Sequence, residues 1–107
     1  MGDLSKMMEA AQQMQTKMTE MQESLTRLTV TGEAGGGLVK ATATAKGELT
    51  GLDIDPSIFQ PSEKEVVEDL ILAAIKDAQR RATDKSAEEM ARLTREMGLP
   101  SDLKMPF

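Results

Sequence analysis

Apolar side chains recur at alternating spacings of three and four residues through the first 28 positions of the chain: Leu4, Met7, Ala11, Met14, Met18, Met21, Leu25 and Leu28. This heptad repeat is typical of one long helix with a continuous apolar seam. At 1.5 Å per residue, the helix is roughly 35–40 Å long. A strand of about eight residues spans only ~27 Å, so the helix is longer than a sheet packed beside it. Part of the seam therefore needs a covering other than the sheet.

The seam is filled mainly with methionine, a flexible side chain that adapts to irregular partners and specifies register poorly. Three coverings are open: a second copy of the chain, the C-terminal helix, or another protein. A small domain buries only about 60% of its surface, so oligomerisation is a natural supplement to its core. We favour the second copy, and the candidate dimer-interface residues are Met7, Met14, Met18 and Met21.

After Leu28 the period of the pattern changes from heptad to alternating, which indicates strands. Gly35 to Gly37 supply a hairpin turn, and Gly47 marks a second turn. Between the turns, one face of the middle strand carries small apolar side chains that let a helix approach closely: Val39, Ala41, Ala43 and Ala45. A third strand, from Leu49 to Ile54, ends at Asp55-Pro56. The short connections predict an antiparallel meander within residues 28–55.

The remaining pattern is helical. Ser62 and Glu65 form a capping-box pattern after Pro61. The predicted buried face of this helix comprises Val66, Val67, Leu70, Ile71, Ala74, Ile75, Ala78 and Ala82. Gly98 and Pro100 end it. The sequence thus predicts an α+β fold in one domain over residues 1–107: a helix over about 3–27, strands over about 28–55, a helix over about 62–97 and a C-terminal tail over 98–107. We expect the apolar residues of the tail to dock on a neighbouring surface.

The composition removes most catalytic and cofactor chemistry. The chain contains neither cysteine nor histidine, so it has no disulfide, thiolate nucleophile, imidazole base or metal ligand of either type. Gly35 to Gly37 precede a strand rather than a Lys-Ser/Thr helix start, so they indicate a turn and not a phosphate-binding loop. Asp53 and Asp55 share one strand face and could bind Mg²⁺, but solvated carboxylates are the commoner outcome. We predict neither an enzyme nor a metal, a cofactor or a small-molecule substrate.

The longest apolar run, Leu70 to Ile75, is far shorter than the roughly 20 residues that span a bilayer. The first residues are polar and are not followed by the apolar core of a signal peptide. The sequence therefore predicts a cytoplasmic protein without membrane contact.

Charge is unevenly distributed along the chain, which has 13 basic and 18 acidic residues and a net charge of -5. Its one basic cluster consists of Lys76, Arg80, Arg81 and Lys85 on the predicted second helix, and Lys40, Lys46 and Arg27 add charge elsewhere. The cluster predicts phosphate contacts, while the alternative is a solvated helix face with i,i+4 partners such as Asp77 and Arg81. A sequence pI of about 4.7 is opposite to the usual basic character of nucleic-acid-binding domains. The scarcity of aromatic residues argues against single-stranded recognition.

Several short motifs, in their order along the chain, resemble one known family: Ala10-Ala11-Gln12-Gln13-Met14-Gln15, Lys17-Met18, Met21-Gln22-Glu23, Val30-Thr31-Gly32-Glu33, Gly37-Leu38-Val39-Lys40, Ile54-Asp55-Pro56-Ser57, Glu68-Asp69-Leu70, Ala73-Ala74, Asp77-Ala78, Arg80-Arg81, Leu99-Pro100 and Lys104-Met105-Pro106-Phe107. The chain resembles the YbaB/EbfC family of bacterial nucleoid-associated DNA-binding proteins, nearly from end to end. The resemblance implies a tweezer-like homodimer that binds duplex DNA with little sequence preference. It also implies a role in nucleoid organisation or gene regulation. Some relatives begin with a Gly- and Lys-rich stretch, whereas this chain offers only Lys6 near that end.

These observations predict a non-enzymatic nucleoid protein that contacts the DNA backbone and bends or bridges the duplex. Its candidate DNA-binding residues are Arg80, Arg81, Lys76, Lys85, Lys40, Lys46, Arg27 and Lys6. The alternative is an acidic cytoplasmic adaptor whose Met-rich helix binds another protein. The adaptor predicts a captured partner and no DNA shift at low salt, and the DNA-binding protein predicts the reverse.

Overall fold

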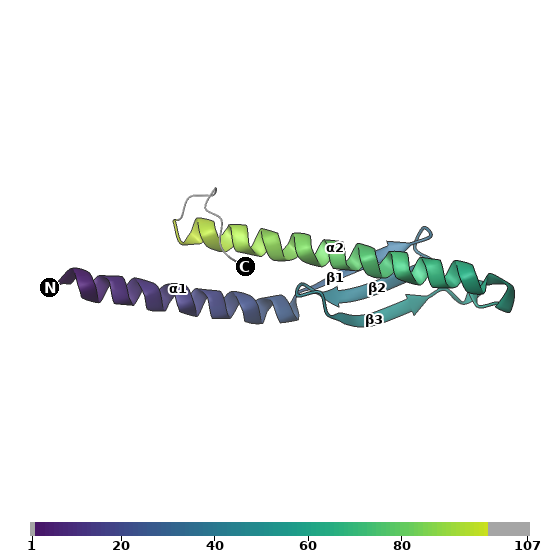
Figure 1. Ribbon diagram of the computed structural model, residues 1–107, viewed down its shortest axis with the longest axis horizontal. Helices are drawn as coiled ribbons and strands as arrows, with labels where there is room; N and C mark the ends of the chain where they lie inside the picture. The colour runs from purple at the N-terminus through teal and green to yellow at the C-terminus, as the bar shows by residue number, and fades with distance from the viewer. Residues whose placement is uncertain (1, 99–107) are drawn as a thin grey trace.

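The computed structural model describes residues 2–98, which form two long helices and one small sheet (Figure 1). Helix α1 spans Gly2–Arg27 and helix α2 spans Lys64–Glu96. Between them lie the strands β1 (Thr29–Ala34), β2 (Val39–Thr44) and β3 (Leu49–Ile54), followed by two short 3₁₀ turns, η1 (Pro56–Ile58) and η2 (Pro61–Glu63). The α+β architecture with this order of elements confirms the fold predicted from the sequence.

The sheet is an antiparallel meander in the order β1-β2-β3. Strand β1 pairs with β2 from Thr29 opposite Thr44 to Ala34 opposite Val39. The connection between them contains Gly35, Gly36 and Gly37, with φ angles of 65, 67 and 94°. These left-handed conformations are accessible to glycine without strain, which explains the hairpin turn expected here.

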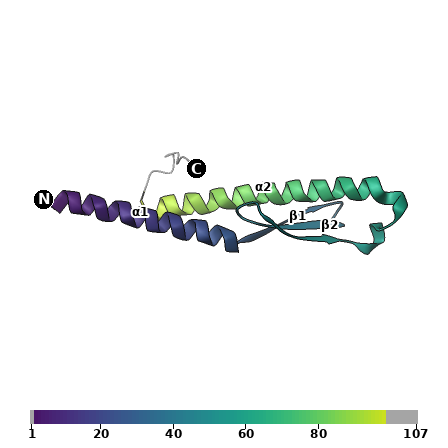
Figure 2. The ribbon, with the colours of Figure 1, turned by 60° about the horizontal axis from the view of Figure 1, so that its bottom comes forward.

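Helix α2 lies across one face of the sheet (Figure 2). The centre of this contact is made by Val39, Ala41 and Ala43 of β2 and by Ala74 and Ala78 of α2, all with 0% exposure. Because nearly all of these side chains are small, the helix backbone approaches the sheet closely. The small apolar face predicted for the middle strand is therefore confirmed as a helix-packing surface.

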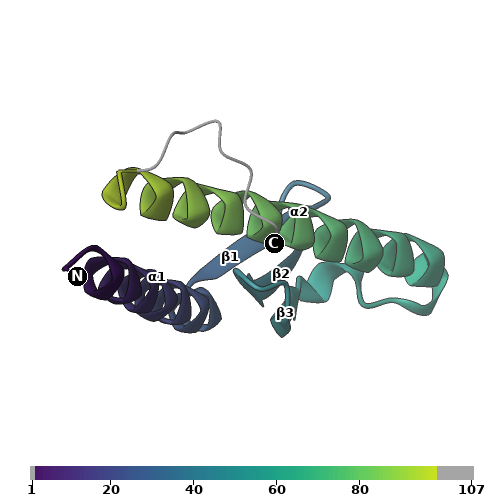
Figure 3. The same ribbon diagram turned by 60° about the vertical axis from the view of Figure 1, so that its left-hand side comes forward.

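A second apolar cluster lies beyond the sheet, where α1 meets the C-terminal half of α2 (Figures 1 and 3). Met21 and Leu25 of α1 are buried there against Leu93 and Ala45, and Met18 packs at the edge of the cluster. The C-terminal helix thus covers the last part of the heptad seam, one of the three coverings that the sequence left open.

The first part of the seam is uncovered within the chain. Leu4, Met7 and Met8 are 62, 68 and 60% exposed, and Met14 is half-buried. The molecule is elongated as a result, with extents of 75 × 23 × 17 Å. The 26 residues of α1 form a helix about 38 Å long, so its N-terminal part projects past the sheet.

Two details of the second helix differ from the sequence-based prediction. The helix begins at Lys64 rather than near residue 62, and Ser62 lies inside the turn η2, so the capping box is wrong. Pro61 starts this turn with its fixed φ, and the N–H of Glu63 donates to the carbonyl of Gln60 at 2.9 Å, so the chain is already turned before Ser62 could cap a helix.

Val66, expected on the buried face of the second helix, is 48% exposed. Leu70 and Ile71 are half-buried and pack against the core between the helix and the sheet, and Val67 is also half-buried. Val66 lies about 100° around the helix from Val67, so its side chain faces solvent. The predicted tail after Gly98 lies outside the described residues.

Candidate nucleic-acid interface

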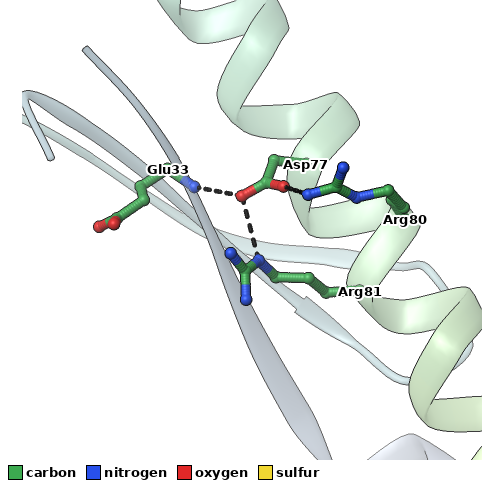
Figure 4. Close-up of polar contacts among 4 residues, drawn as sticks. All are labelled: Glu33, Asp77, Arg80 and Arg81. Atoms are coloured by element: carbon green, nitrogen blue, oxygen red, sulfur yellow. Dashed lines mark hydrogen bonds and ion pairs between the residues drawn. The ribbon is translucent and has the colours of Figure 1, made fainter. Parts of the chain in front are cut away.

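The carboxylate of Asp77 organises the predicted basic cluster (Figure 4). Asp77 lies on α2 at the edge that faces β1. Its Oδ2 accepts the backbone N–H of Glu33 at 3.0 Å and the Nε–H of Arg81 at 3.0 Å. Its Oδ1 accepts a hydrogen bond from an Nη of Arg80. One carboxylate thus holds two guanidinium groups and joins them to the first strand.

These contacts lower the pKa of Asp77 below its ordinary value of 3.8. The largest cause is the hydrogen bond from the backbone N–H of Glu33, followed by the hydrogen bond from Arg81 and the positive charges of the two arginines. Asp77 is therefore ionised at neutral pH and offsets one of the two arginine charges.

Both arginines remain open to solvent despite this pairing. The side chains of Arg80 and Arg81 are 69 and 51% exposed, whereas that of Asp77 is 15% exposed. A guanidinium has five N–H donors, and within residues 2–98 each arginine uses one of them on Asp77. The remaining donors are available to a phosphate, because Asp77 occupies only one edge of each planar group.

Lys85 extends the cluster by one turn of α2. Its Nζ lies 3.9 Å from an oxygen of Glu88 and 3.8 Å from one of Glu89, which are loose contacts. Lys85 and Arg81 line a shallow hollow of 370 Å³ beside Val30 and Thr31 of β1. Lys76 is exposed and makes no ion pair within the described part of the chain.

The cluster is close to electrically neutral as a whole. Residues 76–89 contain equal numbers of cations and carboxylates: Lys76, Arg80, Arg81 and Lys85 against Asp77, Asp84, Glu88 and Glu89. Attraction over a Debye length is therefore weak, and an anion gains from this surface only by direct hydrogen bonds to the exposed groups.

The structure separates the other candidate cations from this cluster. Lys40 alternates with the buried Val39 and Ala41, so it lies on the sheet face opposite α2. Lys46 lies in the turn between β2 and β3, and Arg27 ends α1. Lys6 lies on the projecting part of α1, and all four residues are exposed.

The link between Asp77 and the backbone of Glu33 was not visible in the sequence. It depends on how closely α2 approaches β1 at Gly32, where an added Cβ would lie 2.1 Å from the backbone nitrogen of Ala78. A glycine inside a strand often marks a place where another backbone approaches closely. Gly32 was therefore the one feature of the sequence that could have indicated this contact.

Neither a metal site nor a membrane span is present in the part of the chain described. Residues 2–98 contain no group of three or more ligating side chains that could hold a metal ion. Asp55, considered above as a cation ligand, instead accepts the backbone N–H of Ser57 at 2.8 Å and caps η1. Hydrogen bonding by the side chain of Ser57, followed by this backbone N–H, lowers the pKa of Asp55 below its ordinary value. None of the helices in that region is long and apolar enough to cross a membrane.

The fold and this surface define a small α+β protein with an exposed arginine pair on its longest helix. Residues 1–97 match the YbaB/EbfC DNA-binding family. All 107 residues align, over the full length of each relative, with the nucleoid-associated protein Atu0095 of Agrobacterium fabrum at 45% identity and the nucleoid-associated protein GDI3467 of Gluconacetobacter diazotrophicus at 42%. The chain belongs to the YbaB/EbfC DNA-binding family, which confirms the resemblance noted in its motifs.

The fold is also similar to a solved structure, that of the uncharacterized protein HP0035 from Helicobacter pylori. The TM-score is 0.66 over 89% of this chain and 96% of that chain, with 24% sequence identity. At this identity the similarity concerns the arrangement of helices and strands.

Proposed function

We propose that this protein is a non-enzymatic component of the bacterial nucleoid that binds duplex DNA as a homodimer with little sequence preference. The proposal rests on family membership and on one observation in the structure: Asp77 holds Arg80 and Arg81 side by side with most of their donors free. Guanidinium groups bind phosphate oxygens through paired N–H donors, and phosphate contacts carry little sequence information.

The acidic balance of the chain limits how binding occurs. A dimer carries twice the net charge of -5, so DNA is not attracted at long range. Binding then depends on a local arginine surface that displaces counterions from a few phosphates. Two such surfaces related by a two-fold axis contact the duplex at separate places, and bending or bridging of the DNA is the mechanical result.

Exposed apolar surface supports the homodimer. Besides the uncovered start of α1, Leu49 and Leu52 on β3 and Leu72 on α2 are about half-exposed. A chain of 107 residues that leaves this much apolar surface in water gains stability by burying it against a second copy. The candidate interface residues Met7 and Met14 are available for this role, whereas Met21 and Met18 already pack within the chain.

Fluorescence anisotropy with three unrelated duplexes of equal length tests the proposal. We expect dissociation constants that agree within a few-fold at one salt concentration and weaken as salt rises. Energy transfer between dyes at the two ends of a longer duplex reports bending. Absence of binding at low salt, together with a protein partner captured through α1, would favour the adaptor that Leu4, Met7 and Met8 suggest.

A further inference from the structure

We propose that residues 99–107 of this chain occupy the groove between α1 and the C-terminal half of α2. The groove has a volume of 770 Å³ and three walls: the end of α1, the turn between β2 and β3, and one side of α2. The proposal concerns the folding of the chain on itself and does not depend on DNA binding.

The lining of the groove is mainly apolar, and small side chains leave space within it. Met21 and Leu25 of α1 form one wall, and Met90 faces them from α2. Along α2 the rest of this wall is built mainly of alanine, threonine and serine, including Ala87 and Ala91. Small residues leave room for large apolar side chains from elsewhere, and methionine adapts to their shape.

The C-terminal end of α2 delivers the chain to one end of this groove. Thr94 and Arg95, in the last turn of α2, belong to its lining. The N–H of Met97 donates to the carbonyl of Leu93 at 2.9 Å, and Gly98 has a φ of 73°. This left-handed glycine ends the helix and permits a sharp change of direction.

The remaining segment is long enough to reverse direction and cover the groove. From Arg95 back to Ala82, the far end of the lining on α2, the helix covers about 20 Å. Nine residues follow Gly98, and in an extended conformation they span about 30 Å. The segment can therefore turn back and run along the whole groove.

The sequence of the segment complements the lining. Leu103, Met105 and Phe107 alternate with Lys104 and Pro106, so in an extended conformation the three apolar side chains share one face. Pro100 and Pro106 disfavour a helix here and reduce the conformational entropy lost on docking.

The rim of the groove offers two cations to the single carboxylate of the segment. Lys46 and Arg95 are exposed cations on the rim of the groove, and neither makes an ion pair within residues 2–98. The segment contributes one carboxylate, that of Asp102, and one ammonium group, that of Lys104, so its side chains carry no net charge. Asp102 can pair with one of the two rim cations, whereas a basic partner helix would place like charges against both.

The aromatic composition gives a clean test by NMR of the full chain labelled with ¹³C at the methionine methyl groups. Phe59 and Phe107 are the only aromatic residues, so they alone shift nearby methyl resonances through ring currents. We expect Phe107→Leu to move the Met21 and Met90 resonances and to leave those of Met7 and Met8 in place. Phe59→Leu is the matched control, because Phe59 precedes α2 and Met90 lies about 39 Å along that helix from its start. Unmoved Met21 and Met90 resonances in Phe107→Leu would overturn the proposal.

Trypsin cleavage after Lys104 gives an independent measurement. A docked segment is cleaved only when it opens, so Leu103→Ser with Phe107→Ser should accelerate cleavage about tenfold or more. Ser101→Ala should leave the rate unchanged. Equal rates in all three proteins would contradict docking.

A mixing experiment by NMR distinguishes docking within one chain from docking on a second copy. Unlabelled Phe107→Leu protein is mixed with labelled unsubstituted protein. A change in the labelled Met90 resonance on mixing would show that the segment comes from the second copy, which contradicts docking within one chain.

Discussion

The backbone N–H of Glu33 donates to the carboxylate of Asp77 at 3.0 Å, across 44 positions of the sequence. This bond is made at the edge of the sheet where α2 passes closest to β1, beside Gly32. The same carboxylate accepts hydrogen bonds from Arg80 and Arg81. Helix docking and the presentation of the two arginines are therefore coupled through one side chain.

The stability of the protein should fall at acid pH in a way that depends on Asp77. Its pKa in the folded protein lies below the ordinary value of 3.8, so the ionised form favours folding. This stabilisation is complete above the unfolded pKa of about 3.9 and is lost as pH falls through the lower folded pKa. Melting temperatures of the unsubstituted protein and Asp77→Asn, measured from pH 7 to pH 2, should therefore converge at the acid end.

Glu33→Gln is the matched control for this experiment, since Asp77 is bonded to the backbone of residue 33 and not to its side chain. Its melting temperature should follow pH as that of the unsubstituted protein does. A gap between the unsubstituted protein and Asp77→Asn that stays constant over the whole pH range would refute the role of the Asp77 charge.

Replacing Arg80 and Arg81 with alanine should weaken DNA binding and flatten its salt dependence. Each phosphate contact contributes about 0.9 to the slope of log K against log salt. Loss of both arginines in both copies of a dimer removes up to four contacts, so the slope should shrink by roughly 3–4. Binding titrations at several salt concentrations, with unrelated duplexes, measure this change.

Lys64→Ala with Arg92→Ala is the matched control for the arginine pair. It also removes two cations of α2 that are ion-paired to carboxylates, Glu68 and Glu89, and it should leave the salt slope unchanged. A folded Arg80/Arg81 double variant that binds DNA with the original slope would show that the arginines only support the fold. Circular dichroism melts establish that each variant is folded.

Gly32→Ala should destabilise the protein by about 3 kcal/mol or more, the upper part of the range for overpacking. The new Cβ meets backbone atoms of α2, with the carbonyl oxygen of Ala74 at 2.6 Å, so the helix must move away from the sheet. Gly51→Ala is the control, because its nearest neighbour outside the adjoining residues is Thr42 at 3.7 Å. Urea denaturation at one protein concentration compares the two, and similar midpoints for both variants would contradict the close approach.

Sedimentation at low micromolar concentration should show a mass of twice 11.6 kDa. Met14→Lys should weaken this dimer, since a charge would enter an apolar seam. Thr19→Lys places the same charge on an exposed part of α1 away from the seam and should leave the mass unchanged. A folded monomer of the unsubstituted protein at this concentration would contradict the dimer hypothesis.

The sequence alone determined the order and type of the elements. The heptad spacing from Leu4 to Leu28, the alternation from Val30 to Ile54 and the glycines at the turns are local patterns, and local geometry suffices to interpret them. The apolar face of the second helix was largely predicted too, since a helical period fixes which residues share a side. The residues that form the basic cluster were also predicted, because residues three and four positions apart are neighbours on a helix surface.

Tertiary structure decided what those surfaces contact. Only the packing of α2 on β1 places Asp77 against Glu33, and only the meeting of α1 with Leu93 covers Met21 while Met7 is left in water. The start of α2 was also decided by the chain path through Pro61 rather than by the capping pattern of Ser62. Contacts between distant residues depend on the relative placement of whole elements, and a period in one segment carries no information about its partner.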